Sequence, residues 1–550
     1  MTLTENRLYL FLISAVAAIS VLSLSGEIME PDGALYAGIA KRMVLTGDWI
    51  NLYVNGNDWL DKPHFTFWVT ALSFKLFGIS APAYKLPALL FTFSGAWYTY
   101  LLGRSICNKR IGLVSSLIFL TALHLVISNF DVRAEGYLCA LIIAAVYHYY
   151  KAQQESFWHV VAGSLFAAAA VMTKGMFAVI PVFSGFIIYW ILTGQARQLL
   201  RARWWAALFM LLLFIVPELY ALYTQFDLHP EKVVFGQKAV SGIRFFFIDS
   251  QFGRFLNTGP IRGKGDLSFF LHTTLWAFLP WSLLLCTAVF QLFKRRHREG
   301  QPQEIIILWT SAAATFLLFS FSRFQLPHYI IVLFPFFAVI NAIYLTSLRD
   351  RALQIFSYIQ NVLFLLVILL LCAIALLSGF KNNYLTAGMM MMVTLLSFIY
   401  IKGRNQLMLV ARGSLLSAGI MVFLYAFFYP ALLRYQAGMT AGQWLRNNHP
   451  KTTTAIFSDS NAFAFAFYAG GIPKYLPDTH ALDKLLSSRP VNDKLIIYTP
   501  ASAASLLKEK YGAQVLKSFD HYRITRLKGK FLNAKTRPAT LEKYLLLQLN

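Results

Sequence analysis

Long apolar runs recur almost from one end of this chain to the other, separated by short polar or basic stretches. A helix needs about 20 apolar residues to cross the hydrocarbon layer of a membrane. The pattern therefore predicts thirteen membrane-spanning helices. They lie near residues 7–26, 83–103, 111–128, 132–150, 157–174, 176–193, 204–224, 268–292, 304–321, 327–348, 354–378, 384–401 and 408–430. We expect the first to be retained, because further spans follow it and no small-residue cleavage site precedes Glu27.

Composition agrees with a multi-pass membrane protein: 57% of the 550 residues are hydrophobic and only 13% are charged. The net charge of +24 does not indicate nucleic-acid binding, because the cations gather in short loops that follow spans two, six, eight, ten and twelve. Cationic loops mark the cytoplasmic side, so the N-terminus is expected there. The four cysteines show no spacing typical of disulfides or of a zinc site.

The alternation of spans places two long loops, residues 27–82 and 225–267, on the outer face together with the tail, residues 431–550. Residues 1–430 would form the transmembrane domain. In the first loop, Gly33 to Val44 has an amphipathic pattern with Lys41 and Arg42 opposite the apolar positions, which predicts a helix along the membrane interface. In the tail, TTTAIFSD and KLIIYTP predict strands and three other stretches predict helices, so we expect a small α/β domain.

Carboxylates beside membrane spans are costly to keep near lipid unless they face a cavity, so they are the first candidates for a site. Asp32 lies at the start of the amphipathic segment, where it is either functional or an N-cap. Asp131 and Glu135 lie at the outer mouth of span four, one helical turn apart, and are expected to share a face. For these two the alternative is an Asp N-cap with a neutralising Arg. The further candidates near these acids are Glu30, Asp61 and Arg133.

Several cations break the rule that places positive charge inside. The ones we single out are Lys62, Lys174, Arg244, Arg254, Arg262 and Arg323. They indicate an anionic partner, either a phosphate in a reaction or anionic lipid without chemistry. His328 and Tyr329 follow on the same face, and a lone histidine more often makes local hydrogen bonds than binds metal. Acids and cations in one outer cavity suit transfer of a sugar from a lipid phosphate.

Six motifs in fixed order carry a resemblance over roughly residues 7–348. They are EPDGALYAGIAKRMVLTGDW, NGNDWLDKPHFTFW, DVRAEGYL, MTKG, FLPWS and SRFQLPHYIIVLFP. This order resembles the superfamily of bacterial aminoarabinose transferases and protein O-mannosyltransferases. The resemblance implies a membrane all-α GT-C fold with a small C-terminal periplasmic α/β domain, a polyprenyl-phosphate sugar donor and an inverting transfer.

The resemblance also implies roles for individual residues. The acid that positions or activates the acceptor falls on Asp32, the second acid on Glu135, and the lysine that holds the lipid phosphate on Lys62. Tyr329 matches a tyrosine that follows a Leu-Pro pair. The histidine that the aminoarabinose branch pairs with the first-loop glutamate at a structural metal has no counterpart in GPIRGKGDLSFF. We therefore predict no metal.

The sequence thus favours a glycosyltransferase of the bacterial inner membrane that moves a sugar from undecaprenyl phosphate to lipid A or another glycolipid. Asp32 and Glu135 would be the catalytic acids, and Lys62, Arg244, Arg254 and Arg262 would bind the donor phosphate. We expect a monomer without a cofactor, surrounded by membrane lipids. A protein O-mannosyltransferase, a lipid or polysaccharide transporter, and a receptor that acts through its tail remain as alternatives.

Overall fold

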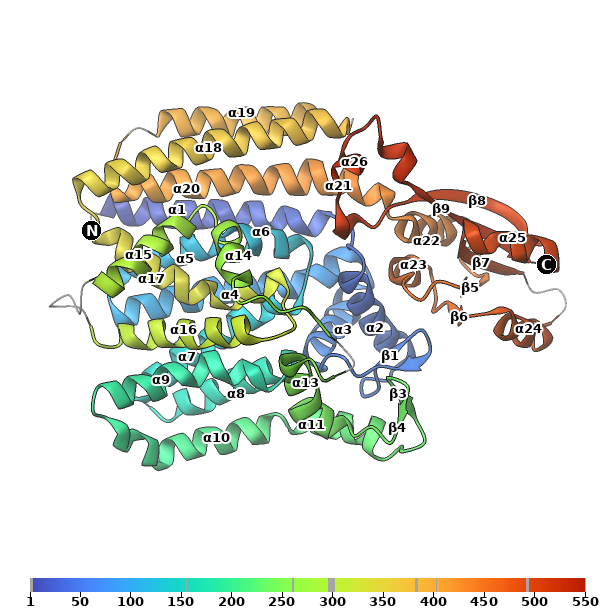
Figure 1. Ribbon diagram of the computed structural model, residues 1–550, viewed down its shortest axis with the longest axis horizontal. Helices are drawn as coiled ribbons and strands as arrows, with labels where there is room; N and C mark the ends of the chain where they lie inside the picture. The colour runs from blue at the N-terminus through green and yellow to red at the C-terminus, as the bar shows by residue number, and fades with distance from the viewer. Residues whose placement is uncertain are drawn as a thin grey trace.

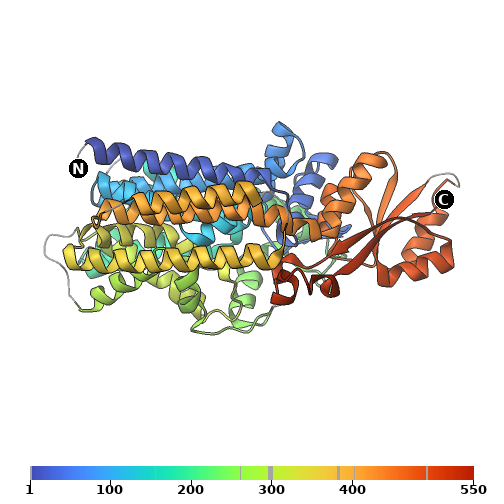
Figure 2. The same ribbon diagram turned by 90° about the horizontal axis from the view of Figure 1, so that it is seen from above.

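The computed structural model describes residues 3–154, 156–259, 262–294, 302–380, 384–401, 403–490 and 494–549. The helices form an elongated bundle, and the tail projects from the end of the bundle opposite the start of α1 (Figures 1 and 2). This arrangement is the membrane-bundle-plus-tail architecture that the sequence predicts. Which end faces which side of a membrane stays a prediction.

A helix lies at each of the thirteen predicted positions. The bundle helices are α1 (Leu3–Ser20), α4 (Ala81–Ile106), α5 (Lys109–Leu120), α6 (Leu123–Phe130), α7 (Ala134–Ala152), α8 (Trp158–Lys174), α9 (Val179–Leu192), α10 (Ala202–Phe214), α11 (Val216–Leu222), α14 (Phe269–Ala277), α15 (Ser282–Lys294), α16 (Ile305–Phe321), α17 (Phe334–Thr346), α18 (Asp350–Ser378), α19 (Tyr384–Tyr400), α20 (Gln406–Val422) and α21 (Tyr429–Leu432). Among the described residues, five helices are long and apolar enough to cross a membrane, or six if one bent pair is a single span. Thirteen crossings therefore remain a prediction.

Two of the expected spans are broken rather than continuous. The chain bends by 55° between α5 and α6, and a non-helical turn separates α14 from α15. The two breaks lie against each other: the Leu123 N–H donates to the Leu279 carbonyl at 2.9 Å, and the Trp281 indole donates to the Thr121 hydroxyl at 2.9 Å. Because lipid offers no hydrogen bonds, irregular backbone is tolerated in a bundle only where protein groups satisfy it in this way.

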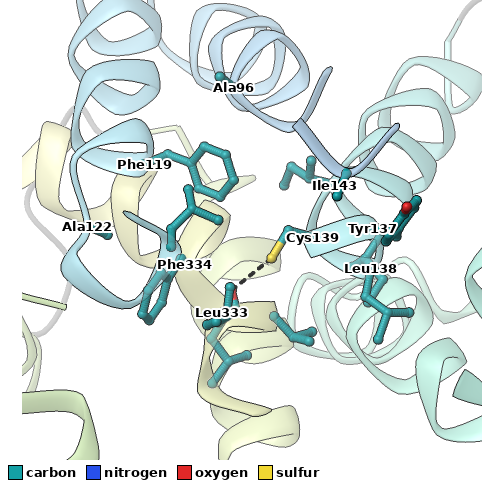
Figure 3. Packing of buried hydrophobic residues seen from close by; sticks show 14 of the residues in the cluster. Ala96, Phe119, Ala122, Tyr137, Leu138, Cys139, Ile143, Leu333 and Phe334 are labelled. Carbon is teal, nitrogen blue, oxygen red and sulfur yellow. Dashed lines mark hydrogen bonds between the residues drawn. The ribbon is translucent and has the colours of Figure 1, made fainter. Parts of the chain in front are cut away.

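The centre of the bundle is tightly packed around α7. Cys139 is fully buried, and its thiol donates to the Ile331 carbonyl at 3.1 Å. Figure 3 shows Phe119 and Phe334 beside this cysteine. Burial among apolar side chains explains why this cysteine pairs with no other.

The first loop contains a helix where one was predicted. It runs α2 (Asp32–Thr46), a hairpin of β1 (Tyr53–Val54) and β2 (Asn57–Asp58), then α3 (Phe65–Phe77). Lys41, which the sequence pattern places opposite the apolar positions of this helix, is only 3% exposed. The tail packs over that face of α2, so amphipathicity there reflects a protein interface rather than a lipid surface. The second loop holds β3 (Val233–Val234), β4 (Gln237–Lys238), α12 (Gly242–Arg244) and α13 (Ser250–Leu256).

The tail is a five-stranded mixed sheet in the order β6-β5-β7-β9-β8, flanked by helices. Its elements are α22 (Ala437–Asn448), β5 (Thr453–Phe457), α23 (Phe463–Tyr468), β6 (Lys474–Leu476), α24 (Thr479–Ser487), β7 (Leu495–Pro500), α25 (Ala501–Tyr511), β8 (Gln514–His521), α26 (Gly529–Leu532) and β9 (Glu542–Leu549). The two predicted strands and three predicted helices are present. The sequence analysis missed β6, β8 and β9. Helices α22 and α23 cover one face of the sheet, and α24 and α25 cover the other.

The α22–α23 side of the tail holds the segment that leads into α2. The Gln436 side chain accepts from the Glu30 N–H and donates to the Ile28 carbonyl, both at 2.9 Å. The Tyr468 hydroxyl accepts from the Ile28 N–H at 2.8 Å and donates to the Glu27 carboxylate at 2.7 Å. The tail therefore holds the first loop through hydrogen bonds to both its backbone and its side chains.

Two buried titratable groups complete this interface. The Lys41 ammonium donates to the carbonyls of Ala466, Phe467 and Ala469 at 2.6 to 2.9 Å, so it caps the C-terminal end of α23. The Glu30 carboxylate accepts from the Ala464 N–H at 2.6 Å, at the start of α23. One short helix of the tail is thus held at both ends by residues of the first loop.

We predict that Lys41→Met weakens the attachment of the tail. The substitution leaves three buried carbonyls without their donor, and the expected loss is about 2 kcal/mol of unfolding free energy. The loss is measured by thermal unfolding of the detergent-solubilised protein and by the rate of proteolytic cleavage in residues 457–470. Lys75→Met, at an exposed position on α3, serves as the control. Equal stability of both variants would contradict the role assigned to Lys41.

We also predict that Glu30 makes the unfolding free energy depend on pH. Burial raises the pKa of Glu30 to about 8 from an ordinary 4.5. The folded protein therefore holds an extra proton between these values, and the unfolding free energy falls as pH rises through this window, by up to about 1.4 kcal/mol per pH unit. Glu30→Gln should remove this fall. The melting temperature of the variant should therefore rise relative to that of the parent as the pH increases from 5 to 8. Glu509→Gln, at an exposed position on α25, should run parallel to the parent.

Candidate active site

The first group of site residues is centred on Arg133, at the start of α7. Its guanidinium donates to the Asp32 carboxylate at 2.5 Å and to the Asp131 carboxylate at 3.0 Å. Asp32 is the first residue of α2 and Pro31 occupies the N-cap, so the N-cap alternative for Asp32 is wrong. The Asp32 side chain remains 37% exposed and is accessible to a ligand.

The prediction that Asp131 and Glu135 share one helical face is also wrong. Asp131 is the C-cap residue that follows α6, and α7 begins only at Ala134, so the two acids do not lie on one helix. Arg133 lies between them at the N-cap of α7. Burial raises the pKa of Asp131, even though Arg133 acts in the opposite direction.

The second group joins the two outer loops. The Asp61 carboxylate binds the Lys62 ammonium at 2.6 Å and, with its other oxygen, the guanidinium of Arg254 from α13. Burial would raise the pKa of Asp61, but Lys62 and Arg254 outweigh burial and lower it. One carboxylate between two cations leaves a net positive charge, which suits an anion.

The third group lies at the end of α8. The Lys174 ammonium binds the Glu135 carboxylate and lies 3.7 Å from the centre of the Tyr329 ring. His328 Nε2 is 3.8 Å from the same carboxylate. Glu135 is only 2% exposed, so its contacts are with these neighbours rather than with solvent.

A cleft connects the second and third groups. It is lined mostly by apolar side chains, including Leu138, Phe177 and Phe319, and Lys174 and Arg254 both face it. Its empty space, counting the open mouth, is about 750 Å³. An apolar groove with two cations fits an amphiphile that has an anionic head group and a hydrocarbon chain.

Other predicted residues lie outside these groups. Arg244 is 72% exposed and pairs with Asp249 at 3.5 Å. The exposed Arg262 donates to the Gly259 carbonyl at 3.3 Å, and Arg323 is also exposed. Glu30 faces the tail and not the site. The described residues contain no group of three or more His, Cys, Asp or Glu side chains able to hold a metal ion, and the absence of a metal stays a prediction.

Gln251 on α13 was missed by the sequence analysis. It is buried and lines the cleft next to Arg254. A Cβ at Gly175 would come within 2.1 Å of the Gln251 amide nitrogen, and Gly175 has a positive φ of 99°. The positive φ favours glycine at this position of the MTKG motif, and a side chain here would also displace the Gln251 amide. That glycine was the only sequence signal, since the sequence analysis places Gln251 in the outer loop 225–267, where no periodic pattern marks a buried residue.

Comparisons with known proteins find similar sequences over much of this chain. A family described as dolichyl-phosphate-mannose-protein mannosyltransferase matches residues 61–220. An uncharacterised protein of Aquifex aeolicus is 26% identical over 81% of this chain and 82% of its own length. The undecaprenyl phosphate-alpha-4-amino-4-deoxy-L-arabinose arabinosyl transferase of Edwardsiella ictaluri is 28% identical over 61% of this chain. That match spans only 59% of the relative's own length.

A solved structure extends the likeness over nearly the whole chain. ArnT from Cupriavidus metallidurans, bound to undecaprenyl phosphate, superposes with a TM-score of 0.77 at 17% identity. The superposition covers 98% of this chain and 97% of that one, which establishes the fold. Together with the sequence matches, it shows that the chain has an ArnT-like GT-C fold and is similar in sequence to bacterial aminoarabinose transferases and, over residues 61–220, to the protein mannosyltransferase family.

Proposed function

We propose that this protein transfers a sugar from a polyprenyl-phosphate donor to an acceptor on the outer face of the bacterial inner membrane. The observation that carries the proposal is the cleft whose mostly apolar lining includes the cations Lys174 and Arg254. Lys62 lies beside them through its shared partner Asp61. The groove suits the polyprenyl chain, and the cations suit its phosphate.

In the reaction, the bond between the anomeric carbon and the phosphate oxygen breaks, and the phosphate leaves with its bonding electrons. Negative charge then grows on that oxygen. Arg254, Lys62 and Lys174 stabilise it from fixed positions in a site partly shielded from water. The acceptor oxygen forms the new bond from the opposite side of the sugar ring, which inverts the anomeric configuration.

Asp32 is the group proposed to orient the acceptor and take its proton. Its carboxylate is accessible, and Arg133 holds it in place from one side only. If the acceptor is itself a phosphate, no proton has to be removed and Asp32 positions it. Glu135 is buried against Lys174, so we assign it to positioning that ammonium.

The names of the relatives include undecaprenyl phosphate, which favours undecaprenyl phosphate as the donor here. We further propose lipid A or another glycolipid as the acceptor, a monomer in the inner membrane and a periplasmic tail. The matching family model, described as a protein mannosyltransferase, favours a protein acceptor as the second candidate. Both candidates use the same cleft.

We predict that Arg254→Gln and Lys62→Gln each lower the rate of sugar transfer about 100-fold, because each removes a charge that stabilises the leaving phosphate. The assay contains purified protein, undecaprenyl-phosphate aminoarabinose or polyprenyl-phosphate mannose, and lipid A or a serine-rich peptide. Products are scored by mass spectrometry, which also separates the two acceptor classes. Arg262→Gln removes an exposed charge from the same loop and should stay within twofold of the parent. Full activity of both cleft variants would overturn the proposed phosphate site.

We further predict that Asp32→Asn lowers kcat by 100-fold or more on a hydroxyl acceptor while donor binding stays unchanged. Donor binding is measured separately with a fluorescent polyprenyl phosphate. Glu231→Gln, an exposed acid of the second loop, is the matched control. Movement of the lipid across reconstituted vesicles without sugar transfer from any donor would instead support the transporter alternative.

A further inference from the structure

A basic stretch in the tail lies outside the proposed active site. Residues 521–541, HYRITRLKGKFLNAKTRPATL, contain six cations and no acid. Five of these cations are exposed, and one of them, Arg523, lines a separate pocket with Glu542. The other four exposed cations are Arg526, Lys528, Lys530 and Lys535. We call these four residues the basic surface.

The cations of the basic surface have no acidic neighbour to neutralise them. Among the described residues, none of the four forms an ion pair. The nearest acids along the chain, Asp520 and Glu542, are engaged elsewhere: Asp520 pairs with Lys543 at 2.5 Å, and Glu542 lines a separate pocket with Arg523. Four unpaired like charges within ten residues repel one another, so they favour an anionic partner.

The stretch is anchored to the end of a bundle helix. The Ala534 N–H donates to the Leu377 carbonyl at 2.9 Å, and the Arg537 guanidinium donates to the Ser378 carbonyl at 2.5 Å. Both acceptors belong to the last turn of α18, whose free carbonyls attract donors and cations. Arg537 is buried and lies 4.4 Å from the centre of the Phe380 ring. Figures 1 and 2 both show α26 beside this end of α18.

This anchor fixes the height of the basic surface relative to a membrane. Helix α18 has 29 residues and is about 43 Å long, which exceeds a hydrocarbon layer of about 30 Å. The exposed fractions of Leu376 and Leu377 are 83% and 56%, so apolar surface continues to the last turn. If α18 crosses the membrane as its length and composition allow, we expect the residues attached to that turn to lie at the level of the lipid head groups. Leu527, an exposed apolar side chain between Arg526 and Lys528, suits such a boundary.

We propose that the basic surface binds the anionic head groups of the membrane leaflet on the tail's side. The cations attract lipid phosphates, and the anchor at α18 holds them where those phosphates lie. The contact adds a second attachment of the tail, to lipid, beside its attachment to the first loop. The proposal does not depend on the proposed transfer reaction.

The experiment compares lipid binding by the full-length protein and three variants. Detergent-solubilised protein is titrated with phosphatidylglycerol or phosphatidylcholine, and bound lipid is counted by native mass spectrometry. One variant changes Arg526, Lys528, Lys530 and Lys535 to Gln. The matched control changes Lys451, Lys484, Lys494 and Lys508, exposed residues of the tail outside the basic surface, to Gln. A third variant replaces Lys528, Lys530 and Lys535 by Arg and keeps the charge.

A cation near an anionic lipid surface strengthens binding about fivefold, so the loss of four should lower the preference for phosphatidylglycerol by at least about tenfold. The remote control and the Arg variant should keep the parent's preference for phosphatidylglycerol. Salt should weaken this preference in the parent, the remote control and the Arg variant. An unchanged preference in the first variant, or an equal loss in the remote control, would overturn the proposal. Displacement by inorganic phosphate beyond that by sodium chloride of equal ionic strength would also overturn it, in favour of a discrete phosphate site.

Discussion

The bridge that Arg133 makes between Asp32 and Asp131 organises the site. Asp32 and Arg133 are 101 positions apart, yet their side chains meet at 2.5 Å. Charges beside a membrane lose most of their hydration, and leaving one unpaired is strongly destabilising. The same requirement explains the Asp61 group and the Glu135 group. Each group contains at least one ion pair between distant segments, namely Asp32 with Arg133, Asp61 with Arg254 and Glu135 with Lys174, and these pairs hold the loops and helices together.

Most of the bundle was predictable because each helix carries its own apolar signal. The two breaks were not, since Leu123 and Leu279 form a hydrogen bond that depends on segments far apart in the sequence. The burial of the face of α2 that carries Lys41 was also not predictable. A lysine in an amphipathic pattern indicates solvent, but Lys41 finds three carbonyls in the tail, and no local pattern reveals such a partner.

The individual site residues were easier to nominate than to arrange. Asp32, Lys62 and Arg254 stood out because charges on the outer face of a membrane protein are unusual. The same criterion selected Arg244 and Arg262, which are exposed and lie apart from the cleft. The exposure of each arginine side chain, and the direction in which it points, depend on how α12 and α13 fold back onto the bundle. Charge along the sequence therefore found the candidates, and only tertiary contacts separated those in the cleft from those on the surface.

The support of the first loop by the tail has a consequence for the order of synthesis. Glu27, Ile28 and Glu30 contact Gln436, Ala464 and Tyr468, which lie more than 400 positions later. While the ribosome is still making the chain, the segment that carries Asp32 has already been inserted but lacks its partner. A nascent chain thus carries an unfinished site throughout its insertion. We expect it to be completed only when α23 has folded and docked against the first loop, which makes the last part of the chain a requirement for the first part of the site.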